Sequence, residues 1–433
     1  MLITDSGLPP RLAERLEALR ARPIDTTEKG FACQDAVCAA SMARAHPPLH
    51  LAGLNYPVLA LRESALQANA RAMADYCARH GVDHAPHGKT HMSPELAALQ
   101  IAHGAWAITV ASIGQLRVYR DFGFGRLLLA NELTDAAGIA WLAAEMAADP
   151  DFEPLCYVDD IKTTEFLART YGGSTSGHDL PVRPLPVLVE IGHADGRTGC
   201  RTDEEALAVA KAVSATPGLR LAGVSGFEGT IGHDDTSEML ARVTEFCRRL
   251  RRLADTLRPG DAADFVVSAG GSTCFDLVTE QLTMGGTDGF RVVLRSGAYL
   301  AHDHGIYARM SPGARGIAGT PEFRPAIELW AQVWSRPEPG LAILGFGRRD
   351  AGFDAGLPVP LRTADGTSAG PDWRVTKLMD QHAYVSVPEQ TALAPGDLVC
   401  FGISHPCTTL DKWRVMPVVD DDGLVRDVVH AFF

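Results

Sequence analysis

Lys89 is the residue whose surroundings first indicate chemistry. It lies in the segment Pro-His-Gly-Lys-Thr-His, residues 86–91, beside one glycine and two histidines and at the end of a short predicted strand. A lysine amine becomes a nucleophile when desolvation or neighbouring cations lower its pKa. Because most lysines are surface charges, this residue alone leaves two interpretations open: an imine-forming amine or a solvated loop residue.

Two glycine-rich stretches could supply the partners of such an amine. Gly270, Gly271 and Ser272 form one cluster, and turns of this kind expose backbone N–H groups that can hold a phosphate. Arg197 lies in the other stretch, the loop 192–200. A tight turn and an ordinary surface charge are the alternative explanations when each feature is taken alone.

His405 and Cys407 form a third candidate site. On an extended segment, side chains at i and i+2 point the same way, so an imidazole and a thiolate at this spacing can bind one divalent ion. Only two ligands are evident, although His382 precedes the pair. An open coordination sphere is what a catalytic Lewis acid needs. The alternative is a half-buried cysteine beside a hydrogen-bonding histidine.

Short apolar segments alternate with amphipathic ones between residues 84 and 294, which indicates a parallel sheet that is buried on both faces. Eight such units are the number that a (β/α)8 barrel of the TIM type needs. The alternative is an open doubly wound sheet, although no Gly-x-Gly-x-x-Gly follows the first strand. The predicted strands are 84–89, 105–110, 126–130, 155–159, 186–191, 221–225, 264–268 and 291–294.

A barrel would bring together the segment that contains Lys89, the loop that contains Arg197 and the Gly270–Ser272 cluster. Active sites of such barrels lie at the C-terminal ends of the strands. Lys89 ends the first strand, Arg197 follows the fifth, the glycine cluster follows the seventh and Tyr299 follows the eighth. This combination suggests pyridoxal phosphate, with an imine, a ring partner and a phosphate anchor.

The pattern changes after about residue 311. Strand-like runs separated by turn residues replace helical spacing, which indicates a β-rich domain. We therefore predict an N-terminal extension (1–55) that packs on the β domain, a barrel (56–310) and a C-terminal β-rich domain (311–433) that carries the metal site. The stretches 172–184 and 352–372 are predicted to be polar loops.

Composition limits the class of protein. The 433 residues include 46% hydrophobic and 21% charged residues, as in an ordinary globular protein. A net charge of −13 argues against a nucleic-acid partner or an anionic membrane surface. Nine cysteines without a Cys-x-x-Cys pair do not form a disulfide framework, and neither a signal peptide nor an apolar run of about 18 residues occurs. We expect a cytoplasmic protein.

The motifs resemble those of the D-serine dehydratase/D-threonine aldolase family. The likeness extends from about residue 56 to the C-terminus, and its motifs occur in order. They are Pro86–Glu95, Gly104–Ala111, Leu129–Leu133, Val189–Gly199, Ser268–Ser272 and His405–Cys407. The resemblance implies a fold-type-III, alanine-racemase-like pyridoxal phosphate enzyme: a barrel followed by a β domain, usually dimeric.

The resemblance also implies roles for individual residues. Lys89 would be the Schiff-base lysine and general base, and Arg197 would lie near the pyridine nitrogen. Gly270, Gly271 and Ser272 would hold the phosphate, and Tyr299 is predicted to contact the cofactor as well. The metal ligands would be His405 and Cys407, with zinc expected.

The expected reaction is β-elimination from a β-hydroxy D-amino acid, most simply D-serine to pyruvate and ammonia. Aldolase members of the family tend to have His-x-Asp where this chain has His405-Pro-Cys407, so the cysteine favours a dehydratase. The alternatives are D-threonine aldolase-type cleavage to glycine and an aldehyde, and a racemase. A non-enzymatic carrier of the cofactor would lack the β domain.

Overall fold

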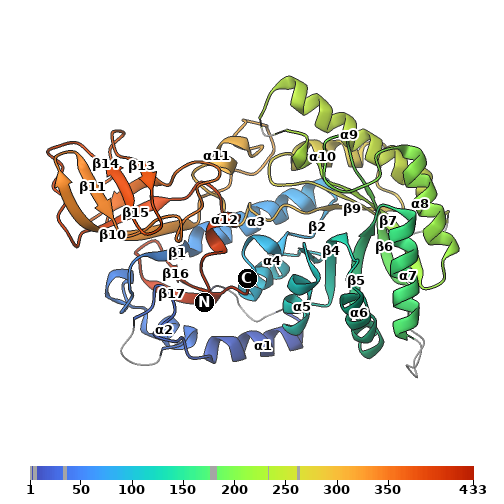
Figure 1. The fold of residues 1–433 in the computed structure, drawn as a ribbon, viewed down its shortest axis with the longest axis horizontal. Helices are drawn as coiled ribbons and strands as arrows, with labels where there is room; N and C mark the ends of the chain where they lie inside the picture. Colours follow the sequence, from blue (N-terminus) through green and yellow to red (C-terminus); the bar gives the residue numbers. More distant parts are fainter. Residues whose placement is uncertain (1, 3–6, 33–36, 176–182, 233, 261–263) are drawn as a thin grey trace. The chain divides into compact units, whose positions relative to one another are not determined.

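The computed structural model describes residues 2, 7–32, 37–175, 183–232, 234–260 and 264–433. The chain forms two compact units, each assembled from separate stretches. The barrel unit comprises residues 74–89 and 104–297, and the β-sheet unit comprises residues 1–73, 90–103 and 298–433. Figure 1 shows the elements of both units.

Eight parallel strands form the sheet of the barrel unit, in the order β2-β9-β8-β7-β6-β5-β4-β3. A bridge between His87 and Thr109 joins the segment after β2 to β3, so the sheet closes on itself. The strands correspond to the eight predicted ones, and the predicted TIM-type barrel is confirmed. They are β2 (Asp83–His84), β3 (Ile108–Val110), β4 (Arg126–Glu132), β5 (Glu153–Val158), β6 (Leu185–Ile191), β7 (Leu219–Gly226), β8 (Phe265–Ala269) and β9 (Phe290–Leu294).

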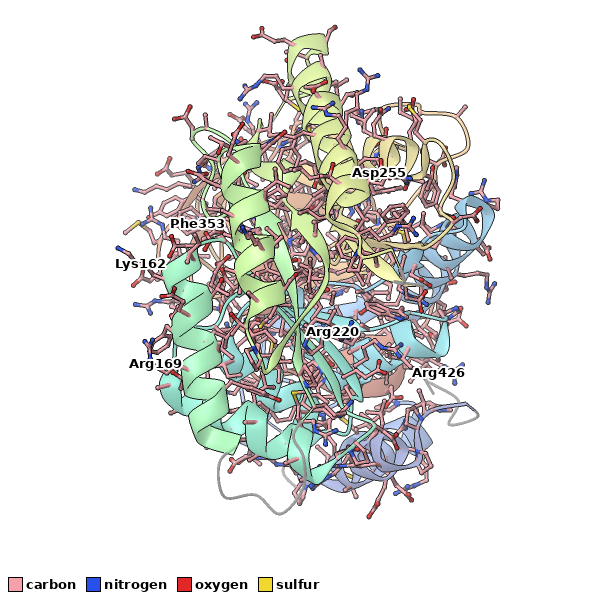
Figure 2. The ribbon with its side chains drawn as sticks, turned by 90° about the vertical axis from the view of Figure 1, so that its right-hand side faces the viewer. Lys162, Arg169, Arg220, Asp255, Phe353 and Arg426 are labelled. Atoms are coloured by element: carbon pink, nitrogen blue, oxygen red, sulfur yellow. The ribbon has the colours of Figure 1, made fainter. Side chains whose placement is uncertain are left out.

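Amphipathic helices follow the strands of the barrel unit. Several begin at a side chain that accepts a hydrogen bond from a backbone N–H of the first turn, such as Asp135 and Thr202. Lys162 and Arg169 of α7 are exposed and lie on the outer side of their helix (Figure 2). The helices are α5 (Ile113–Asp121), α6 (Ala136–Ala148), α7 (Ile161–Thr175), α8 (Asp203–Ala215), α9 (Ser237–Leu257) and α10 (Phe275–Thr283), with the end of α3 (Glu63–His80).

Nine strands form the sheet of the β-sheet unit, with a main path β13-β14-β11-β10-β1-β16-β17 and with β12 and β15 paired beside it. Eight of these nine strands lie within residues 311–433, the region predicted to be β-rich, whereas β1 lies near the start of the chain. They are β1 (Val58–Arg62), β10 (Ile327–Glu338), β11 (Leu341–Leu344), β12 (Val359–Thr363), β13 (Arg374–Leu378), β14 (Ala383–Ser386), β15 (Leu398–Gly402), β16 (Val415–Val419) and β17 (Val425–His430).

The exception, β1, explains why the units are discontinuous. It pairs antiparallel with β10 and parallel with β16, so a strand from the start of the chain lies within the C-terminal sheet. The segment 90–103, with helix α4 (Pro94–Ala102), belongs to the same unit. The compact units therefore do not have the contiguous boundaries that the sequence suggests.

Residues of the N-terminal extension contribute to the core of the β-sheet unit. Ile24, Phe31 and Met42 are buried in one cluster with residues of β1, β10, β16 and β17. The described helices of this unit are α1 (Pro10–Ala21), α2 (Ala39–Ala45), α4, α11 (Ile306–Met310) and α12 (Cys407–Leu410), with the start of α3.

Two predicted loops differ from the structure. The stretch 352–372 contains β12, whose alternation of apolar and polar residues is too short to identify without its partner β15. The stretch 172–184 begins inside α7, and its residues 176–182 lie outside the described part of the chain. No helix within the described residues is both long and apolar enough to cross a membrane.

Candidate active site

Lys89 lies in a single 3-10 turn, Gly88–Thr90, directly after the bridge that closes the barrel. The strand predicted to end at Lys89 ends earlier, at His84. The Tyr119 hydroxyl donates to the carbonyl oxygen of Gly88 at 2.9 Å. A Cβ atom at Gly88 would lie 2.6 Å from that hydroxyl, so only glycine allows the turn to approach Tyr119 so closely.

Three positive charges surround His87 at this end of the barrel. Burial and these charges lower the pKa of His87 well below its ordinary value, so the imidazole is neutral. The charges are those of Lys89, Arg295 and Arg197. The barrel therefore brings together the predicted imine-forming lysine and ring-partner arginine, and adds Arg295, which the sequence did not single out although it directly follows β9.

Arg295 is a fixed positive charge. Its side chain is buried, and its guanidinium donates to the Ser225 hydroxyl at 3.1 Å, to the Ser268 hydroxyl at 2.7 Å and to the Gly226 carbonyl oxygen at 2.7 Å. These partners come from β7 and β8. A guanidinium held by neutral acceptors keeps its full charge for an anion in the same region.

The loop that carries Arg197 is held by a second arginine. The Arg201 guanidinium donates to four successive carbonyl oxygens of residues 196–199, at 2.7 to 3.0 Å. The Gly199 N–H donates to an Asp159 carboxylate oxygen at 2.9 Å. The Arg197 guanidinium lies over the Phe227 ring, 4.5 Å from its centroid. Backbone anchoring and stacking together restrict where this guanidinium can lie.

The glycine cluster has a partner that the sequence did not indicate. The N–H groups of Gly270 and Gly271 donate to the two carboxylate oxygens of Glu228, at 3.1 and 2.6 Å. Gly270 has φ +97°, a conformation that favours glycine. While they bond Glu228, these two amides cannot donate to a phosphate. Ser272, which is buried and follows directly, is the remaining predicted donor.

Three carboxylates meet at the ends of neighbouring strands. Glu132, Asp159 and Glu190 each place an oxygen within 4.8 Å of the others, a spacing that suits a metal ion or a shared proton. Burial and the charge of Glu190 raise the pKa of Glu132 to about 8. One oxygen each of Glu132 and Glu190 is buried without a hydrogen-bond partner among the described residues.

The predicted metal ligands lie two positions apart in the β-sheet unit, at the start of α12. The hydrogen bond to Cys407, together with Asp354, raises the pKa of His405 to about 9. The predicted extended segment is wrong, because Pro406 is helical (φ −61°, ψ −46°) and Cys407 begins α12. Both residues nevertheless lie at the same turn, and an imidazole with a thiolate is a ligand set that can hold one ion. Their chemistry fits a soft-to-borderline divalent metal.

Asp354 is a partner that the sequence did not identify, because it lies in the predicted loop 352–372. Its carboxylate bonds His405 Nδ1 at 2.6 Å and accepts from the Thr408 hydroxyl at 2.6 Å. A carboxylate on one ring nitrogen orients a metal-binding histidine for the other. Cys407 Sγ lies 3.5 Å from the hydroxyl oxygen of Thr90, the residue after Lys89 in the chain.

Two other predicted residues lie in the β-sheet unit. Tyr299 is buried, and its hydroxyl accepts a hydrogen bond from the Gln100 side chain at 3.0 Å. His382 packs edge-on against Trp334, with ring centroids 5.2 Å apart. Among the described residues, neither it nor another histidine, cysteine or carboxylate completes a three-ligand group with His405 and Cys407.

Comparison with known families identifies the chain. Residues 61–285, 225 of its 433 residues, match the family described as alanine racemase, N-terminal domain, and residues 326–419 match a putative serine dehydratase domain. The chain belongs to the alanine-racemase-like family of pyridoxal phosphate enzymes. Its motifs are those of the D-serine dehydratase/D-threonine aldolase branch, as the sequence predicted.

Individual relatives of this alanine-racemase-like chain include aldolases. A D-threonine aldolase from an Arthrobacter species is 28% identical over 388 residues, which cover 89% of this chain and 94% of that protein. A 3-hydroxy-D-aspartate aldolase from Paracoccus denitrificans is 26% identical, and the alignment covers 81% of this chain and 87% of that protein.

Solved structures agree on the fold. A crystal structure of D-threonine aldolase from Filomicrobium marinum has a TM-score of 0.74 at 24% identity and covers 88% of this chain and 96% of that one. A D-threo-3-hydroxyaspartate dehydratase from a Delftia species has a TM-score of 0.71 at 21% identity, and the match covers 88% of this chain and 98% of that chain.

The barrel unit fits the family's cofactor in part. A lysine and two arginines beside a neutral imidazole suit a carbonyl compound that carries a phosphate. The two glycine amides do not fit the phosphate role predicted for them, because Glu228 already accepts from both. Lys89, Arg197 and Ser272 would hold the cofactor, and Arg295 would add charge.

Proposed function

We propose that this chain is a pyridoxal phosphate- and metal-dependent lyase that acts on β-hydroxy D-amino acids, and that it converts D-serine to pyruvate and ammonia by β-elimination. The observation that carries the proposal is the pair of His405 and Cys407 at the start of α12, with His405 oriented by Asp354. A metal at this pair would act on a hydroxyl leaving group, which neither racemisation nor cofactor storage requires.

The residues of the chain would divide the work as follows. Lys89 binds the cofactor covalently and, once released as a neutral amine, removes the proton from the substrate's α-carbon. When bound, the cofactor supplies an electron-accepting ring. Arg197 near the pyridine nitrogen would disfavour ring protonation because like charges repel. That weakens the ring as an electron acceptor and leaves more of the stabilisation to the metal.

His405 and Cys407 would hold a divalent ion, which we propose to be zinc because a thiolate is a soft ligand. When bound, such an ion would supply a Lewis acid for the substrate's β-hydroxyl. A structure of D-threo-3-hydroxyaspartate dehydratase with a cysteine replaced by alanine is described as metal-free. In another structure of that enzyme the replaced residue is a histidine two positions earlier, the spacing of His405 and Cys407.

An aldolase is the second candidate, because the relatives named above are a D-threonine aldolase and a 3-hydroxy-D-aspartate aldolase. Both reactions need a β-hydroxyl group bound near the metal. They differ in the bond that breaks: an aldolase deprotonates the hydroxyl and cleaves Cα–Cβ, whereas a dehydratase expels the hydroxyl. The Cys407 thiolate as a metal ligand favours the dehydratase.

We also propose that the protein is a homodimer, which light scattering would test.

The test is a product analysis with purified holoenzyme. D-Serine, D-threonine and D-threo-3-hydroxyaspartate are each incubated with the protein, and keto acid, ammonia, glycine, aldehyde and the enantiomeric ratio are measured together. We expect keto acid and ammonia in equal amounts, and loss of both in Lys89→Arg and after chelation of the metal. Glycine with an aldehyde would establish the aldolase, and an L-enantiomer alone would establish a racemase.

A further inference from the structure

A single turn after β7 contacts both loops that are predicted to hold the cofactor. Residues Glu228–Thr230 form a 3-10 turn, preceded by Phe227. Glu228 accepts from the glycine cluster, as described above, and Phe227 stacks under the Arg197 guanidinium. Thr230 adds a contact to the Arg197 loop, because its hydroxyl lies 2.8 Å from His193 Nε2.

The Glu228 carboxylate is a buried and fully bonded group. Glu228 is 1% exposed, and each carboxylate oxygen accepts from one glycine N–H. Charge-assisted hydrogen bonds of this kind are about twice as strong as neutral ones. A buried carboxylate that lost them would have no solvent to replace them, so the pair of bonds strongly favours one conformation of the glycine turn.

Helix α9 packs against the turn that carries this carboxylate. Burial, followed by the charge of Glu228, raises the pKa of the Cys247 thiol well above its ordinary value. Cys247 lies on the buried face of α9.

Close packing restricts the glycine turn further. A Cβ atom at Gly271 would lie 3.2 Å from the Phe227 ring and 3.3 Å from a Glu228 oxygen. The Ser296 hydroxyl donates to the carbonyl oxygens of Gly270 and Gly271 at 3.2 and 3.1 Å. The backbone leading into Ser272 is therefore held on both its N–H and its carbonyl side.

We propose that the Phe227–Thr230 turn is a positioning element for the cofactor: Glu228 fixes the glycine turn that presents Ser272 to the phosphate, and Phe227 fixes Arg197 for the ring. One segment then sets the spacing between the phosphate end and the ring end. The inference rests on the proposed binding of pyridoxal phosphate, and it assigns to Gly270 and Gly271 a conformational role in place of direct phosphate binding.

The test compares pyridoxal phosphate with pyridoxal, which lacks the phosphate. Protein freed of cofactor is titrated with each, and the dissociation constants are measured by absorbance for wild type, Glu228→Gln and Glu228→Ala. Loss of the bonds that fix the turn should weaken pyridoxal phosphate binding at least about tenfold. The affinity for pyridoxal should change by less than about twofold, because that ligand does not use the phosphate end.

The matched control is Glu238→Gln, the same change at an exposed carboxylate in the first turn of α9. Gly271→Ala is a second perturbation, which moves the turn by contact and keeps the charge, so the test remains decisive if Glu228→Ala does not fold. It should also selectively weaken pyridoxal phosphate. A purely structural role for Glu228 would weaken both ligands equally.

Three outcomes would overturn the inference: unchanged affinities, equal losses for both ligands, or tighter binding of pyridoxal phosphate by Glu228→Ala. The last would mean that the carboxylate competes with the phosphate. Failure of the wild-type protein to bind pyridoxal phosphate, checked by borohydride reduction and the mass of the peptide containing Lys89, would instead refute the proposed function.

Discussion

Replacing Glu132 with glutamine should stabilise the protein at neutral and alkaline pH. Glu132 lies against Glu190 and Asp159, and burial with the charge of Glu190 raises its pKa from 4.5 to about 8. The folded protein therefore binds this proton more tightly than the unfolded chain. The resulting stabilisation is complete below about pH 4.5 and is lost as the pH rises through about 8.

The size of the effect follows from the shift. One pKa unit is worth about 1.4 kcal/mol, so the full shift corresponds to at most about 5 kcal/mol of unfolding free energy. Because Glu132 is only partly buried and solvent screens its charge, we expect about half of that between pH 5 and pH 8.5. For a unit of this size, each kcal/mol corresponds to about 2 °C in Tm.

The assay is thermal unfolding of wild type and Glu132→Gln from pH 5 to pH 8.5, with EDTA present because a cation bound by the three carboxylates would replace the proton. The Tm difference should be near zero at pH 5 and about 5 °C in favour of the variant at pH 8.5. Glu165→Gln, at an exposed carboxylate of α7, is the control and should give a constant difference. Parallel curves for wild type and Glu132→Gln would refute the reasoning.

Other substitutions test the remaining contacts. Asp354→Asn should lower metal affinity about 10- to 100-fold, since it removes the carboxylate that orients the metal-binding His405. Metal content after competition with a chelator measures this loss, and an unchanged metal content would contradict the orienting role of Asp354. Cys407→Asp replaces a soft ligand with a hard one and should shift the preference from zinc toward manganese when both are supplied at equal concentration. In Arg201→Lys the lysine ammonium cannot donate to all four carbonyl oxygens, so amide hydrogen exchange in residues 192–200 should accelerate at least about tenfold. Equal exchange rates in wild type and variant would exclude the anchoring role of Arg201. Gly88→Ala forces a methyl group onto Tyr119 and should cost about 1–3 kcal/mol of stability, measured by denaturant unfolding.

The fold of the barrel unit could be predicted because its signal is local. Each strand is a short, nearly continuous apolar run, and several of the following helices have a capping side chain and a buried stripe, so eight repeats could be counted without any long-range information. The strand β1 could not be assigned in this way. Its apolar pattern is the same as that of a barrel strand, and only its pairing with β10 and β16 gives its place.

The same distinction holds for the site. The combination of Lys89, Arg197 and the His405–Cys407 pair, together with the family resemblance, indicated covalent and metal chemistry, although each residue taken alone has an ordinary structural explanation. The roles of Ser272 and Tyr299 stay predictions. The sequence did not reveal Asp354, which is 51 residues from the histidine that it orients.

The sequence by itself determined the barrel, the candidate lysine and the candidate metal ligands, since each depends on residues within a few positions of one another. The tertiary structure alone decided that Arg295 joins the positive cluster, that three carboxylates meet in the barrel unit, and that Glu228 bonds the glycine amides. These contacts join residues 27 to 208 positions apart, and their hydrogen bonds depend on strand register and turn conformation, which no local pattern specifies.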